Sequence, residues 1–181
     1  MKLIRFAFLA VMMTFLGSYS AMAQRFAFVD TEYILQHIPE YLAAQNQLDD
    51  ISVQWQEEVD SRFAEIEDLY KKYQEEQVLL SPEMRRQRED EIINLELETK
   101  EFQRLKFGYE GDLFKEKIRL IQPIQERVAN AIQQIAAEQA LDIILDKGGE
   151  VVFLYANPRL DKSDDVIVKL GYKPDPALGG N

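Results

Sequence analysis

The sequence predicts an α+β fold in which a long antiparallel α-helical hairpin, a coiled-coil-like arm, projects from a small β-body assembled between subunits. Residues 39–140 are rich in Glu, Gln, Leu, Lys and Arg, which is the composition of helix. Short apolar stretches typical of strands lie on both sides of this region. Since a single short strand leaves its backbone groups without partners, the segments before and after the arm must meet.

Residues 1–23 have the pattern of a cleaved secretory signal. Two cations precede an apolar run from Phe6 to Leu16, and small residues lead up to Ala23, after which we expect cleavage. The alternative is an uncleaved membrane anchor, but the run is shorter than the ~20 residues that a span requires. We therefore expect an exported protein.

Charge and cysteine content exclude several classes of partner and of stabilisation. The formal net charge of −11 becomes −13 when residues 1–23, with their two cations, are removed. Such a balance disfavours nucleic acid and anionic membrane surfaces as partners. The chain has no cysteine, so neither a disulfide framework nor a cysteine-linked lipid anchor is available.

The β-body is predicted from residues 24–38 and 141–171. Its strands are RFAFV near the start, LDIILD at 141–146 and EVVFLYA at 150–156, with a hairpin turn at Gly148 and Gly149. All three are apolar on both faces, which is typical of strands buried on both sides, so we expect subunits to bury one another. The expected oligomerisation residues are Phe26, Phe28, Ile143, Leu145, Val151 and Phe153.

A short helix from Ser163 to Gly171 is expected to lay its apolar residues on the sheet. The last residues, 172–181, contain two prolines and two glycines, and we expect them to be disordered.

The arm is predicted to turn near residue 81, where Ser81 caps a new helix and Pro82 occupies its first position. Folding there places residue i opposite residue 162 − i, so Pro39 and Pro123 form a pair of neck kinks. Gly108 and Gly111 indicate a bend or a close helix contact in the returning arm. Apolar residues at steps of three, four or seven predict a narrow seam of the coiled-coil kind, through Leu48, Ile51, Trp55, Val59, Ile66, Tyr70 and Tyr73, and Ile92, Leu95, Phe102, Tyr109 and Leu113.

With these elements in order, the chain resembles the Skp family, also called the OmpH family, of periplasmic chaperones for outer-membrane proteins. The resemblance rests on FAFVDTEYIL with its Val29 and Asp30, on Pro-Glu-Tyr at 39–41, on the charged hairpin, on LDIILDKGG and on DKSDDVIVKLG. It covers nearly all of the chain after residue 23. It implies a homotrimer whose subunits share a central β-body and whose three arms enclose an unfolded client.

The first half of the arm departs from the cationic arms that the resemblance implies. Residues 40–70 contain nine acidic side chains and one basic one, Arg62, whereas residues 85–127 contain ten of each. Apolar and aromatic contact is therefore the expected means of holding a client. The residues that we expect to make it are the aromatic side chains off the seam, namely Phe63, Phe102, Phe107 and Phe114. The simpler alternative is that most aromatic residues of the arm form the hairpin core.

No catalytic, metal-binding or cofactor-binding cluster is expected, and the protein is not expected to be an enzyme. The one histidine, His37, stands beside the first proline and favours a structural role. Paired acids such as Asp49 and Asp50 lack the loop spacing of a calcium site. The Gly148–Gly149 pair is not followed by the Lys-Ser/Thr of a phosphate loop.

The resulting hypothesis is an ATP-independent periplasmic holdase that encloses unfolded outer-membrane β-barrel proteins and prevents their aggregation before membrane insertion. It involves no nucleic acid and no stable membrane insertion of the chaperone. The alternative is a coiled-coil structural or adaptor protein of the cell envelope that docks a folded partner through its tip. The tip residues in question are Ser81, Pro82, Arg85, Arg86 and Arg88.

Overall fold

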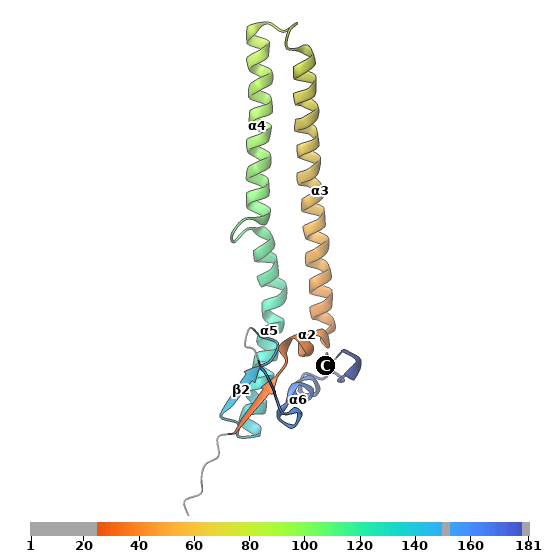
Figure 1. Ribbon diagram of the computed structural model, residues 1–181, viewed down its shortest axis with the longest axis vertical. Coiled ribbons are helices and arrows are strands. Elements are labelled where there is room, and N and C mark those ends of the chain that lie inside the picture. The colour runs from red at the N-terminus through yellow and green to blue at the C-terminus, as the bar shows by residue number, and fades with distance from the viewer. Residues whose placement is uncertain (1–24, 150–152, 179–181) are drawn as a thin grey trace, which may run out of the picture.

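The protein consists of a small body and a long two-helix arm in the computed structural model, which describes residues 25–149 and 153–178 (Figure 1). The predicted signal segment lies outside the described residues. The body contains β1 (Phe26–Val29), α2 (Thr31–Gln36), β2 (Ile143–Asp146), the 3₁₀ helices η1 (Pro158–Leu160) and η2 (Pro176–Leu178), and α6 (Ser163–Lys169). The arm leaves the body as α3 (Pro39–Glu76) and returns as α4 (Pro82–Phe107) and α5 (Asp112–Glu138), whose end lies in the body. The α+β class is confirmed as a mostly helical chain with a small sheet.

The arm begins at a break between two helices. Asp30 caps α2 by accepting a hydrogen bond from the Tyr33 backbone N–H (3.0 Å). Pro39 occupies the start of α3, where the missing N–H of proline costs nothing. The prediction of a kink at Pro39 is therefore wrong, because α2 has already ended at Gln36. Pro123 does lie inside a helix, α5.

The turn at the far end of the arm lies at residues 77–81. Ser81 Oγ accepts a hydrogen bond from the Met84 backbone N–H (3.3 Å), and Pro82 begins α4. Tyr73 donates a hydrogen bond to Glu89 across the two helices, a pair that folding at Ser81 predicts. The hairpin register near the tip thus follows directly from the position of the turn.

At the neck, the pairing of the two sides of the arm departs from the expected pairing of residue i with residue 162 − i. Glu40 lies beside Arg127 (3.4 Å between Oε1 and Nη1), five residues beyond its expected partner at position 122. The cause lies in residues 108–111, which leave the helix axis while α5 continues along the line of α4 (Figure 1). The returning helix therefore uses more residues than α3 for the same length of arm, and Pro39 does not face Pro123.

The seam of α3 follows a heptad pattern. Buried and half-buried positions recur at alternating steps of four and three residues, at Leu48, Ser52, Trp55, Val59, Arg62, Ile66, Leu69 and Tyr73. Two residues predicted to lie in the seam are exposed, Tyr70 by 51% and Tyr109 by 95%. Leu69 takes the seam position next to Tyr70, and Tyr109 lies in the interruption between α4 and α5.

The sheet has two strands, β1 and β2, and they pair in parallel, with Phe26 opposite Ile143. The predicted third strand is not formed in its described part, residues 153–156, while Val151 lies outside the described residues. The Asp146 carboxylate accepts hydrogen bonds from the Thr31 N–H (3.1 Å) and the Gly148 N–H (2.9 Å). Gly148 therefore lies beside the start of α2, and residues 153–156 form no ladder with β2.

The core of the body is formed mainly by helices. Twelve buried residues make one cluster, with Ile34, Ile38, Val166 and Ile167 completely buried. Helix α6 packs on α2 and α5, which corrects the expectation that it lies on the sheet. The Ser163 side chain accepts a hydrogen bond from the Asp30 N–H (2.8 Å) and does not cap its own helix.

The C-terminal segment is ordered over residues 172–178, and the prediction of a disordered tail is wrong there. Tyr172 donates a hydrogen bond to Glu40, and the Asp175 N–H donates one to His37 Nε2 (both 2.8 Å). The segment ends in η2. Its composition resembles that of a disordered tail, but these specific contacts with the neck hold it in place.

Candidate functional site

The middle of the arm is held by a cation–aromatic cluster made of Trp55, Arg62, Phe102, Lys106 and Phe107. The Arg62 guanidinium carbon lies 4.4 Å from the centre of the Phe102 ring, and Lys106 Nζ lies 4.4 Å from the centre of the Trp55 ring. The rings of Trp55 and Phe107 meet edge to face, with 6.3 Å between their centres. Each such contact stabilises by about 0.5–1 kcal/mol at a partly exposed position. Cations and aromatic rings together fill this part of the helix interface.

Beside this cluster, residues 108–111 interrupt the returning helix. A Cβ atom on Gly108 would lie 2.3 Å from the Arg104 carbonyl oxygen, so the loop requires glycine there. Glu110 has a left-handed backbone with φ of 53°. Lys106 Nζ donates to the Asp112 carboxylate (2.8 Å) and so joins the end of α4 to the start of α5. The hydrogen bonds from Lys106 and Lys115 lower the pKa of Asp112 below its ordinary value.

The interruption borders an open groove, which we call the interruption groove, of about 650 Å³. Its surface is mainly apolar. The aromatic side chains nearest to solvent are Tyr109, which is 95% exposed, and Phe114, which is 47% exposed. The lining residues come from α3 on one side (Leu48, Asp49, Ser52) and from the interruption and α5 on the other (Phe107, Gly108, Tyr109, Glu110, Leu113, Phe114, Lys117).

The four predicted client-contact residues occupy two different environments. Phe63 and Phe114 are exposed, whereas Phe102 and Phe107 are half-buried in the cation–aromatic cluster. The structure therefore leaves Phe63 and Phe114 as the more accessible pair. The apolar spacing predicts Tyr109 in the seam, but its position between Gly108 and Gly111 is a signal for a projecting loop.

The tip also exposes apolar residues outside the predicted tip set. Val78 is 81% exposed and Leu79 is 85% exposed. Next to them, the Arg85 side chain donates to the Leu80 carbonyl (3.4 Å). Arg88 pairs with Glu91 on its own helix (2.9 Å), and Arg86 is exposed. Ser81 and Pro82 serve the start of α4, so the tip presents an apolar turn beside arginines.

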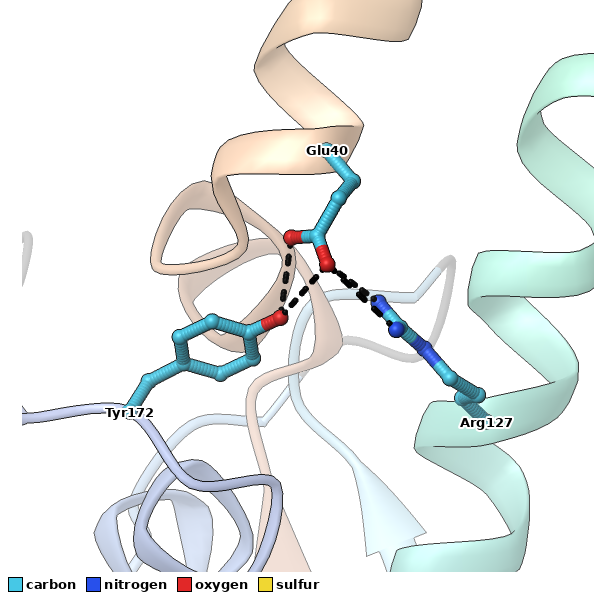
Figure 2. A network of polar contacts seen from close by, with 3 residues as sticks. All are labelled: Glu40, Arg127 and Tyr172. Atoms are coloured by element: carbon cyan, nitrogen blue, oxygen red, sulfur yellow. Dashed lines mark hydrogen bonds and ion pairs between the residues drawn. The ribbon is translucent and has the colours of Figure 1, made fainter.

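The neck is closed by the C-terminal segment through a three-residue network (Figure 2). The Glu40 carboxylate lies between Tyr172, which donates from its hydroxyl at 2.8 Å, and Arg127, which donates at 3.4 Å. The pKa of Glu40 is lowered by a hydrogen bond from its own backbone, then by the bond from Tyr172, with Arg127 adding attraction. Burial, followed by the bond to Glu40, raises the pKa of Tyr172.

Removing the hydroxyl in Tyr172→Phe is expected to loosen the C-terminal segment without unfolding the body. Amide exchange of residues 173–178 should accelerate at pH 7, because Glu40 loses one of its donors. Since the folded state lowers the pKa of Glu40, the contact is complete above pH 4.5 and is lost as the pH falls through the lower folded value. On acidification, the amide exchange rate of this segment in wild type should therefore approach the rate in the variant. Equal exchange rates in the two proteins at pH 7 would contradict the role of the Tyr172 hydroxyl.

His37 has a structural role. It is buried, its Nδ1 donates to the Tyr33 carbonyl (2.8 Å) and its Nε2 accepts from the Asp175 N–H. Both ring nitrogens are thus engaged with backbone groups. Among the described residues, no group of three or more His, Asp or Glu side chains is arranged to hold a metal ion.

One face of the sheet presents apolar side chains to solvent in this single chain. Phe26 and Ile143 are each 53% exposed, and Leu145 is 41% exposed. Phe28 is buried within its own chain, so it differs from the other predicted oligomerisation residues. Phe153, in the segment predicted as a third strand, is half-buried.

Within the described part of the chain, no helix has both the length and the apolar character that a membrane crossing requires. The arm helices α3, α4 and α5 carry charged residues along most of their length.

Comparison with known families shows to which family the chain belongs. Residues 25–170 match the family model described as Outer membrane protein (OmpH-like). The chain belongs to the OmpH-like family. This match confirms the resemblance to the OmpH family that the sequence predicts. Membership of this family supports a chaperone role. A comparison with curated protein sequences finds no significant match.

A solved OmpH-like structure has a similar fold. It is that of a candidate outer membrane chaperone from Caulobacter crescentus CB15, with a TM-score of 0.66 at 16% sequence identity. The alignment covers 84% of this chain and 87% of that one. At this identity the likeness concerns the fold, which both OmpH-like chains keep although most of their residues differ.

Proposed function

We propose that the protein is an ATP-independent holdase of the periplasm that encloses unfolded outer-membrane β-barrel proteins and prevents their aggregation before insertion. The observation that carries the proposal is the number of large apolar side chains left exposed along a two-helix arm. Val53, Phe63, Leu97, Tyr109 and Phe114 are each between 39% and 95% exposed. Unfolded barrel strands expose apolar side chains and unpaired edges, so many weak contacts with such an arm would shield them.

We propose a homotrimer as the functional unit. The exposed apolar face around Phe26, Ile143 and Leu145 supports burial between subunits, because a two-stranded sheet is marginal by itself. The number three follows the implied arrangement of the Skp family. Three arms around one space would hold a client by confinement and by contacts that are individually weak.

The test is aggregation of two unrelated outer-membrane barrels diluted from urea. Protein comprising residues 24–181 is added at one trimer per barrel molecule. It should suppress the rise in light scattering for both barrels. Folded barrels in detergent serve as the control and should not bind. If both unfolded barrels aggregate as fast with the protein as without it, the holdase function is excluded.

A second candidate function, an adaptor that docks a folded partner through the tip, is favoured by the exposed Val78 and Leu79 beside Arg85 and Arg86. The double variant Val78→Ser/Leu79→Ser distinguishes the two functions. A holdase that uses the length of its arms should retain at least half of its suppression of scattering. An adaptor should show no suppression in the first place and should bind one folded partner stoichiometrically.

A further inference from the structure

The interruption groove has the features of a binding site for a side chain. It lies where the returning helix is broken, and Leu48, Leu113 and Phe114 give it an apolar surface. Its volume of about 650 Å³ falls within the range of pockets that bind small ligands. It therefore has room for the ring of an aromatic residue and for part of the chain on either side.

Acidic side chains outnumber free basic side chains in the lining of the groove. Three nearby cations already have partners: Lys106 and Lys115 pair with Asp112, and Arg119 pairs with Glu116. Asp49 and Glu110, which line the groove, form no ion pair among the described residues. Lys117 is the one cation in the lining, so two carboxylates face one ammonium group.

The acidity continues on the α3 side of the groove, because residues 40–70 carry nine acids and one base. A peptide with a cation next to its aromatic residue would thus be attracted, whereas a peptide with an acid there would be repelled. Unfolded barrel proteins supply suitable aromatic residues, because their strands carry aromatic girdles at the two membrane interfaces.

We propose that the interruption groove binds aromatic girdle residues of unfolded barrel clients and prefers those flanked by Lys or Arg. The proposal rests on the proposed holdase function and names the client segment that this function engages. The aromatic ring lies against Phe114 and Leu113, and the neighbouring cation lies near Asp49 and Glu110. The groove thereby selects among client segments by charge as well as by apolar contact.

The test uses two fluorescein-labelled peptides of alternating apolar and polar residues, which differ only in whether Lys or Glu flanks a central Tyr. At low salt, wild type should bind the Lys peptide about five-fold more tightly than the Glu peptide, as expected for partly exposed ion pairs. Phe114→Ser should weaken binding of both peptides by about ten-fold through lost apolar contact. The control Tyr70→Ser changes an exposed aromatic residue elsewhere on the arm and should leave both Kd values within two-fold.

A charge-matched pair of variants separates the groove from the general acidity of the arm. Asp49→Asn/Glu110→Gln should abolish the preference for the Lys peptide, whereas Asp50→Asn/Glu57→Gln removes the same charge outside the groove and should preserve it. Equal loss of preference in both variants, or no effect of Phe114→Ser, overturns the proposal.

Suppression of barrel aggregation by wild type is measured in parallel. If wild type suppresses aggregation but the groove variants bind both peptides as wild type does, the groove proposal fails and the holdase function stands. If wild type does not suppress aggregation, the holdase function itself fails.

Discussion

Replacing Ile34 by alanine is expected to lower the free energy of unfolding by about 3 kcal/mol. Ile34 has no exposed surface and belongs to the core cluster that joins α2 to α5 and α6. Alanine removes three buried carbon atoms and leaves a cavity that rigid neighbouring helices cannot fill. The measurement is a urea titration followed by far-ultraviolet circular dichroism, with both proteins at the same concentration because assembly contributes to stability.

The control for this variant is Val168→Ala. Val168 lies on α6 but is 61% exposed, so its loss should change the free energy by less than about 0.5 kcal/mol. If Ile34→Ala and Val168→Ala shift the urea midpoint equally, the body does not have the core described.

Replacing Gly108 by alanine is expected to destabilise the arm by about 2–3 kcal/mol. The added Cβ would meet the Arg104 carbonyl oxygen at 2.3 Å, and this oxygen is backbone that accepts the Gly108 N–H bond. The interruption must then move, and with it Phe107 and Lys106, which contact Trp55. The single tryptophan makes its fluorescence the appropriate probe, and both the emission maximum and the urea midpoint should change.

Gly149→Ala is the matched control, since a Cβ there would meet its nearest atom, in the Asp146 side chain, at an ordinary distance of 3.6 Å. It should leave the tryptophan spectrum and the midpoint unchanged. A Gly108→Ala protein with the spectrum and the midpoint of wild type would show that the interruption is not shaped by this contact.

The elements that depend on local signals could be predicted from the sequence. The helical composition of the arm, the Ser81–Pro82 start of α4 and the strand ending at Val29 are all encoded within a few residues. The sequence predicts that the first strand meets residues 141–146, and β1 does pair with β2. The strand expected at residues 150–156 could not be judged from local signals, because Gly148 and Gly149 are typical of a hairpin, whereas Asp146 bonds to Thr31, which is distant in the sequence.

The candidate site was less predictable, because it depends on which face of each helix is buried. The heptad pattern of α3 places Leu69 and Tyr73 in the seam, whereas Tyr70, four residues after Ile66, is exposed. The glycines at 108 and 111 indicated a departure from helix but not a full interruption with Tyr109 projecting from it. The order of residues 172–178 rests on contacts of Tyr172 and Asp175 with the neck, which composition alone does not reveal.

The most direct test of the whole account is the mass of the protein with and without a client, measured by light scattering during size-exclusion chromatography. Residues 24–181 alone should have three times the mass of one chain. After mixing with an outer-membrane barrel diluted from urea, the mass should rise by that of one barrel, and the complex should stay soluble. A monomer or dimer that leaves the barrel to aggregate would contradict the proposed assembly and function together.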